Sequence, residues 1–148
     1  MSSKTIFFYG LFMDPDILRR QGYQPSAPTV AKLNNYAIYL GKRATLLPSD
    51  GEQAYGTLMR LSNSELDELY SQPSVHDYQA VNVTCELRED DFIEATTYIL
   101  PEDFLLAPPL NADYARQLLN ICKKMNLPSH YQQKIADIKL SLENQTKK

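Results

Sequence analysis

The sequence lacks the features that mark several classes of protein. Tryptophan is absent, and only two cysteines, two histidines and five glycines occur among its 148 residues. No apolar run approaches the roughly 20 residues that a helix needs to span a bilayer. Positive charge is not in excess, because 15 lysines and arginines stand against 18 acidic residues, giving a net charge of −3 and a pI of about 5.3. We therefore expect neither a membrane partner nor the basic surface of a nucleic-acid-binding protein.

The two cysteines show no spacing typical of metal binding or of a redox motif. Cys85 lies in an alternating strand pattern and Cys122 in a helical pattern, without Cys-x-x-Cys spacing. We expect two buried free thiols, and we expect neither a metal ion nor a cofactor. The first four residues lead directly into a strand pattern, so no signal peptide is expected. Together with the acidic composition, these features favour a cytoplasmic protein.

The composition is otherwise that of an ordinary folded domain. Hydrophobic residues make up 43% of the chain and charged residues 22%. A chain of this length can bury a substantial core. We expect a single domain over residues 1–148, with its core at about residues 5–142 and a polar tail at 143–148. The 10 tyrosines favour a partly polar interior.

The most informative stretch is residues 5–15, with the sequence TIFFYGLFMDP. Its β-branched and aromatic residues predict a buried strand, which Gly10 ends. Asp14 and Pro15 then form an N-cap and first-turn pair for a helix. Backbone N–H groups in such a loop can bind an oxygen anion or a carboxylate. The loop has no lysine and lacks phosphate-loop glycine spacing, which disfavours nucleotide binding. The alternative is an ordinary strand-to-helix turn without a ligand.

Periodicity and turn residues predict the remaining elements. We expect further strands at 30–40, 44–47, 54–61, 78–87 and 92–100, with a turn at 48–51 and a bend or bulge at Asn34-Asn35. We expect helices at 15–20 and at 63–70, the second after the capping box of Ser62 and Glu65. A third helix is expected from a cap at Asn111 or Asp113 to Met125, and a fourth at 129–142. Roughly six mostly antiparallel strands, with helices between and after them, are typical of an α+β fold.

This order of segments resembles the gamma-glutamylcyclotransferase-like superfamily, which includes plant avirulence-induced proteins. The resemblance rests on the Tyr-Gly turn at 9–10, the Gly-x-Leu strand at 56–58 and the Leu-Asp-x-Leu helix at 66–69. It covers roughly residues 5–138. It implies a small mixed, mostly antiparallel β-barrel or strongly curved sheet flanked by helices, with one polar cavity.

The resemblance also implies a reaction. In the family, the α-amine of a γ-glutamyl compound attacks its own γ-carbonyl and releases 5-oxoproline. One carboxylate moves the proton, and positioning of the reacting groups supplies most of the remaining rate acceleration. Carried over by position, the implied substrate-binding residues are Tyr9, Gly10, Leu11, Phe12, Met13, Tyr78 and Tyr114. Arg43 is a further candidate as partner of a substrate carboxylate. The alternatives are core packing for the tyrosines and an exposed strand end for Arg43.

The chain departs from the family at the acid/base glutamate. That position falls on one of three residues, none of them acidic: Tyr70, Ser71 or Gln72. A tyrosine with its usual pKa of about 10 is a poor base at neutral pH. Glu68 is a weak substitute, since it shares a face typical of solvated helix residues. His76, in the loop before Tyr78, has a suitable pKa, but a surface role is the alternative.

Three functional hypotheses remain open at this point. The first is a family member that binds a small metabolite without the usual glutamate chemistry. The second is an active cyclotransferase acting on γ-glutamyl amines or peptides through a displaced acid. The third is a non-catalytic interaction domain. The first two imply a γ-glutamyl or amino-acid-like ligand, whereas a cavity plugged by Phe12 or Tyr70 would favour the third. The sequence does not indicate an oligomeric state.

Overall fold

The computed structural model describes residues 3–40, 44–72, 78–88, 90–100 and 112–146. Its elements in chain order are β1 (Ser3–Phe8), a 3-10 turn (Leu11–Met13), α1 (Pro15–Arg20), β2 (Thr29–Leu40), β3 (Ala44–Ser62), α2 (Asn63–Leu69), β4 (Gln79–Arg88), β5 (Asp91–Ile99), α3 (Ala112–Lys124) and α4 (Ser129–Thr146).

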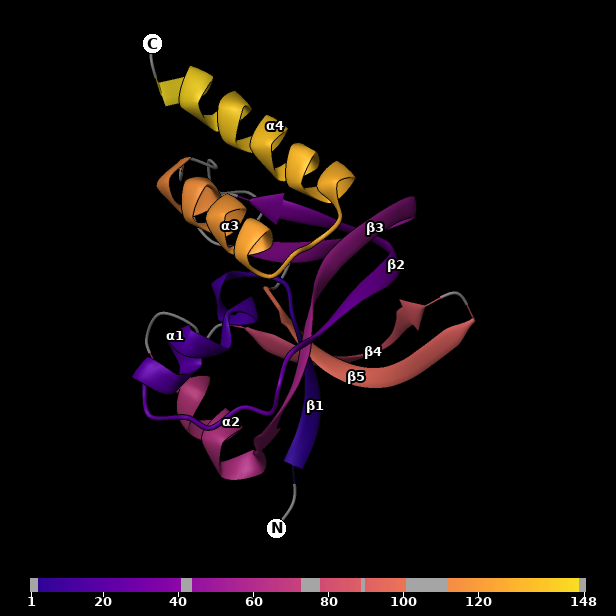
Figure 1. Ribbon diagram of the computed structural model, residues 1–148, viewed down its shortest axis with the longest axis vertical. Coiled ribbons are helices and arrows are strands. Elements are labelled where there is room, and N and C mark those ends of the chain that lie inside the picture. Colours follow the sequence, from indigo (N-terminus) through magenta and orange to yellow (C-terminus); the bar gives the residue numbers. More distant parts are fainter. Residues whose placement is uncertain (1–2, 41–43, 73–77, 89, 101–111, 147–148) are drawn as a thin grey trace.

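The strands of the described residues close into a small barrel in the order β1-β3-β2-β4-β5. Neighbouring strands are antiparallel except β1 and β5, which run parallel where Ile6 lies opposite Thr96. Helices α3 and α4 stack over one end of the barrel, while α1 and α2 lie together at its side (Figure 1). The predicted class, an α+β fold with a mixed and mostly antiparallel curved sheet, is confirmed.

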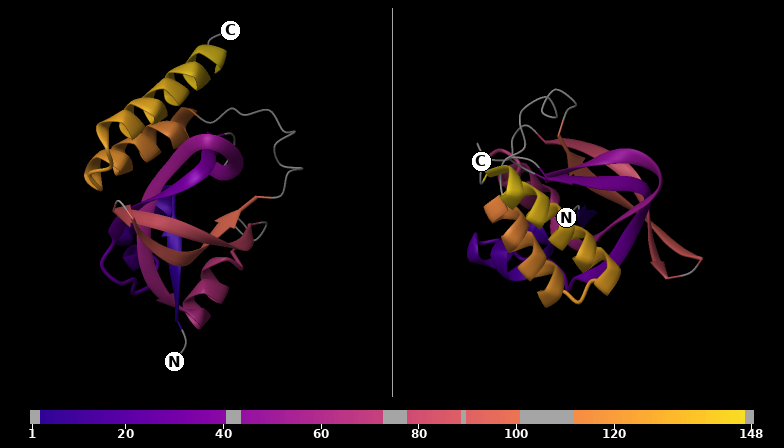
Figure 2. Two further views of the ribbon diagram at one scale, coloured as in Figure 1. Left: turned by 90° about the vertical axis from the view of Figure 1, so that its right-hand side faces the viewer. Right: turned by 90° about the horizontal axis from the view of Figure 1, so that it is seen from above.

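The predicted division of residues 44–61 into two strands is wrong, because β3 is continuous. Asn34 lies opposite Gln53, but Tyr36 lies opposite Pro48, so β3 carries extra residues at this point. Asn35 takes a positive φ of 66°, and its side-chain oxygen accepts a hydrogen bond from the Gly51 N–H at 3.1 Å. The bulge expected at Asn34-Asn35 is present. It bends the long β2–β3 hairpin, whose curve is visible in Figure 2, without ending either strand.

Helices α1 and α2 begin where the sequence predicts. The Asp14 side chain accepts a hydrogen bond from the Asp16 N–H at 3.0 Å, and Pro15 occupies the first turn. Ser62 and Glu65 make the reciprocal bonds of a capping box at the start of α2. These local caps fix the entry of both short helices, and α2 ends beside the site described below.

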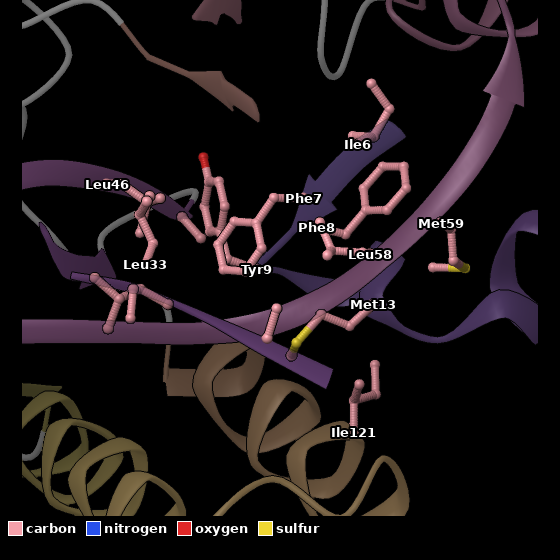
Figure 3. Close-up of a cluster of buried hydrophobic side chains, with 14 of the residues drawn as sticks. Ile6, Phe7, Phe8, Tyr9, Met13, Leu33, Leu46, Leu58, Met59 and Ile121 are labelled. Atoms are coloured by element: carbon pink, nitrogen blue, oxygen red, sulfur yellow. The ribbon is translucent and has the colours of Figure 1, made fainter. Parts of the chain in front are cut away.

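The core fills the barrel and continues under α3. Figure 3 shows Ile6, Phe7 and Phe8 of β1 packed inside the curve of β3, with Met13 between the barrel and α3. A Cβ atom on Gly56 would lie 2.1 Å from the carbonyl oxygen of Phe8, so the two backbones approach closely at this glycine. Both cysteines are buried free thiols, as predicted. In the described part of the chain, no helix is both long and apolar enough to cross a membrane.

Candidate functional site

The site is built around the loop that follows β1. After Tyr9, the chain makes a 3-10 turn in which the Met13 N–H donates to the Gly10 carbonyl at 3.0 Å. Gly10 has an ordinary negative φ of −105°. Its lack of a side chain matters for another reason, because a Cβ there would lie 2.6 Å from the Tyr114 hydroxyl oxygen. Glycine therefore lets α3 approach the loop closely.

A cavity of about 280 Å³ lies beside this loop. For comparison, a dry cavity of about 150 Å³ is large enough to bind benzene. The cavity is lined by residues from the end of β1 and the loop after it, the end of α2, the start of β3, the residue before β4, β5 and α3. They are Phe8, Tyr9, Gly10, Leu11, Phe12, Ala44, Tyr70, Tyr78, Tyr98 and Tyr114.

Three of the lining tyrosines bind the backbone through their hydroxyl groups. The Tyr9 hydroxyl donates to the Tyr98 carbonyl, and the Tyr78 hydroxyl to the Ala44 carbonyl, each at 2.5 Å. The Tyr114 hydroxyl accepts a long hydrogen bond, 3.4 Å, from the Leu11 N–H. These bonds connect strands, loop and helix around the cavity, and they engage polar groups that would otherwise face a ligand.

The aromatic rings also pack on one another. Tyr70, at the end of α2, stacks on Tyr98 with ring centroids 3.7 Å apart and ring planes within 10° of parallel. Tyr70 also lies 6.4 Å from the ring of Tyr78. Phe8 and Phe12 form an edge-to-face pair at 6.2 Å. The cavity wall is therefore largely aromatic carbon.

Four of the lining phenols have a raised pKa and so stay neutral at neutral pH. Burial raises the pKa of Tyr9 and Tyr70 well above their usual value of 10, and neighbouring tyrosines raise it further. Burial raises the pKa of Tyr114 to about 12. For Tyr98, burial is again the main cause, and the Asp67 carboxylate adds to the shift. None of these four phenols is prepared to accept a proton at neutral pH.

Six of the eight binding residues proposed from the sequence line the cavity: Tyr9, Gly10, Leu11, Phe12, Tyr78 and Tyr114. Met13 does not line it. Its side chain is fully buried in the core, and its carbonyl accepts a hydrogen bond from the Thr57 hydroxyl at 3.0 Å. Arg43 lies outside the described residues, as does His76.

The three candidate positions for the family glutamate have different surroundings. Tyr70 lines the cavity. The Ser71 hydroxyl instead donates to the Glu68 carbonyl, and the Gln72 amide contacts Gln21 and Tyr23. Glu68 is exposed on α2 and is not among the lining residues. No carboxylate therefore lines the cavity within the described residues, and Phe12 and Tyr70 bound the cavity without plugging it.

Sequence reasoning missed three lining residues, Phe8, Ala44 and Tyr98. Strand alternation assigns each to a face of its strand but does not say which end of the barrel that face meets. The contact between Tyr98 and the loop depends on barrel closure, because it joins β5 to β1. Among the described residues, no group of three or more histidine, cysteine or acidic side chains is placed to hold a metal ion.

Comparison with known proteins gives a consistent family. The family model for gamma-glutamyl cyclotransferase, AIG2-like, matches residues 6–118. The fold is similar to that of a gamma-glutamyl cyclotransferase, with a TM-score of 0.76 at 22% identity, covering 91% of this chain and 87% of the other. An uncharacterized human protein gives a TM-score of 0.76 at 21% identity, with coverages of 92% and 88%.

A third similar structure is a glutathione-specific gamma-glutamyl cyclotransferase from yeast. Its TM-score is 0.66 at 11% identity, covering 96% of this chain and 97% of the yeast chain. At these identities the structures show a shared fold. No curated protein sequence matches the chain. The family model spans most of the chain, so this protein belongs to the gamma-glutamyl cyclotransferase, AIG2-like family.

Proposed function

We propose that this protein binds a small molecule in the cavity beside the Tyr9–Met13 loop and, lacking the family's glutamate, does not carry out cyclotransfer. The observation that carries the proposal is the cavity itself, which is open yet has Tyr70 and no carboxylate in its described lining. Cyclotransfer requires a group that accepts a proton from the substrate amine and returns it to the leaving group. A phenol whose pKa is raised by burial is unsuited to that role.

The cavity also supports binding over a purely structural role. A plugged cavity was the expectation for an interaction domain, whereas here Phe12 and Tyr70 border about 280 Å³ of open space. Empty apolar volume lowers stability, because the lining atoms lose contacts that a packed core would provide. A ligand that fills the cavity would restore such contacts. We also propose a cytoplasmic location, which the two buried free thiols support.

The catalytic part of the proposal is tested by measuring 5-oxoproline. The wild-type protein is incubated with glutathione, γ-glutamylalanine and a γ-glutamylamine, beside an active gamma-glutamyl cyclotransferase as assay control. We expect no release above the uncatalysed rate. Release by the wild-type protein would contradict the proposal. A Glu68→Gln variant would then show whether the exposed carboxylate on α2 is the displaced acid, because loss of turnover assigns that role to Glu68.

The binding part is tested by thermal unfolding with a library of small charged and uncharged metabolites. A ligand present at a hundred times its Kd stabilises the folded state by about 2.7 kcal/mol. For a chain of this length, that raises the Tm by roughly 5–10 °C. A library in which no compound shifts the Tm would favour an interaction domain instead.

A further inference from the structure

The chemistry of the cavity wall restricts the kind of ligand it accepts. None of the ten described lining residues carries a charge at neutral pH, and seven of them are phenylalanine or tyrosine. A γ-glutamyl compound brings both an α-ammonium and an α-carboxylate group. Each charged group placed in such a cavity loses its hydration. The free-energy cost of this desolvation is large unless a partner of opposite charge or several hydrogen bonds replace the water.

Several polar groups of the wall form hydrogen bonds within the protein. The hydroxyls of Tyr9 and Tyr78 donate to backbone carbonyls at 2.5 Å. The Leu11 N–H, a donor that the family loop would offer to a substrate oxygen, is directed to the Tyr114 hydroxyl. A charged ligand would have to break these bonds to use these groups as partners. A neutral ring needs none of them and gains contact with aromatic carbon.

From these observations we infer that the cavity selects an uncharged ligand with a flat, apolar ring system, and that it disfavours the zwitterionic γ-glutamyl group. The inference rests on the proposed function, since it names the ligand class of the same site. The stacked pair of Tyr70 and Tyr98 shows that aromatic rings pack face to face at this wall. The volume of about 280 Å³ is sufficient for a bicyclic compound, given that benzene occupies cavities of about 150 Å³.

The absence of tryptophan makes a direct test possible. Indole fluorescence can be excited beyond the tyrosine absorption band, so a bound indole is observed without background from the protein. Three probes share one ring and differ in charge: indole is neutral, indole-3-acetate is negative and tryptamine is positive. We expect saturable binding of indole with a blue-shifted emission. Each charged analogue should bind at least about tenfold more weakly than indole. Millimolar γ-glutamylalanine should not displace indole.

A pair of matched variants assigns the binding to this cavity. Phe12 lines the cavity and is partly exposed, so a polar side chain is tolerated there more readily than in the core. Phe12→Glu should reverse the order of affinities, so that tryptamine binds more tightly than indole. In the matched variant Phe12→Gln, the new side chain has the shape of glutamate without its charge. In this variant tryptamine should remain a weaker ligand than indole. Circular dichroism establishes that both variants are folded.

The outcomes separate this inference from the proposed function. If indole-3-acetate or tryptamine binds wild type as tightly as indole, or if γ-glutamylalanine displaces indole, the inference of an uncharged ligand is overturned while non-catalytic binding stands. If indole shows no saturable binding, the inference is likewise overturned. Release of 5-oxoproline by the wild-type protein would instead overturn the proposed function, whichever indole binds.

Discussion

The hydroxyl oxygen of Tyr114 lies over Gly10, where a Cβ atom would be only 2.6 Å away. Through this contact, α3 reaches the loop that follows β1, and the same hydroxyl accepts the Leu11 N–H. One wall of the cavity is thus held by two residues more than 100 positions apart in the sequence. Their fit depends on the absence of a single carbon atom at residue 10.

Gly10→Ala should therefore destabilise the protein by about 1–3 kcal/mol, as expected for overpacking. Tyr114→Phe alone should cost about 0.5–1.5 kcal/mol, the usual net contribution of a hydrogen bond. In the double variant the nearest remaining ring carbon is 3.9 Å from the new methyl group. The double variant should thus be more stable than Gly10→Ala in urea unfolding. Equal stability of the two would show that the hydroxyl is not the obstacle.

Gly56→Ala should be far more damaging. Its Cβ would lie 2.1 Å from the backbone oxygen of Phe8, and backbone in the β1–β3 ladder cannot move aside as a side chain can. We expect a loss above about 3 kcal/mol, or failure to fold. Gly51→Ala is the control: its site is open, and its φ of 82° alone should cost about 1–2 kcal/mol. A folded Gly56→Ala protein with stability near that of the control would contradict the close approach.

The ion pairs between α3 and the start of α1 give a pH-dependent contribution to stability. The Lys124 ammonium lies 2.7 Å from Asp14 and 2.8 Å from Asp16. Lys124 is the main cause of the lowered pKa of Asp16. A carboxyl whose pKa is lower in the folded than in the unfolded state stabilises folding above the unfolded pKa of about 3.9. That contribution disappears as the pH falls through the lower folded value.

Lys124→Met should accordingly lower the urea midpoint at neutral pH, and the difference from wild type should shrink as the solution becomes more acidic than about pH 4. Lys123→Met, one residue earlier on an exposed part of α3, is the matched control and should leave the midpoint nearly unchanged. A difference between wild type and Lys124→Met that is constant from neutral to acid pH would show that lost packing of the lysine stem, and not its charge, is responsible.

The two cysteines should be unreactive in the folded protein. Burial raises the pKa of the Cys85 thiol and of the Cys122 thiol to about 12, so the reactive thiolate is scarce even at mildly alkaline pH. A thiol reagent should label neither cysteine under native conditions and both in concentrated guanidinium chloride. Rapid native labelling of one thiol would show that its element opens locally.

Local chemistry in the sequence was enough to predict the short helices. Asp14-Pro15 and the pair Ser62 and Glu65 satisfy backbone donors within one turn, so the entry of each helix depends on neighbouring residues alone. The same kind of reasoning failed at residues 48–51. Their proline and glycine are typical of a turn, but Pro48 and Gln53 pair with β2 on either side of a bulge at Asn35, which keeps the whole segment within one strand. Tertiary pairing overrode local propensity there.

The cavity shows the same contrast between what the local sequence predicts and what tertiary packing decides. The sequence by itself determined the loop after β1, the lack of an acid at the candidate glutamate positions and the abundance of tyrosine. Only the tertiary structure decided that Tyr70 rather than Ser71 lines the cavity, and that Tyr98 joins it from β5. The reason is physical: alternation along a strand fixes which side chains share a face, but closure of the barrel and the docking of α3 fix which faces meet.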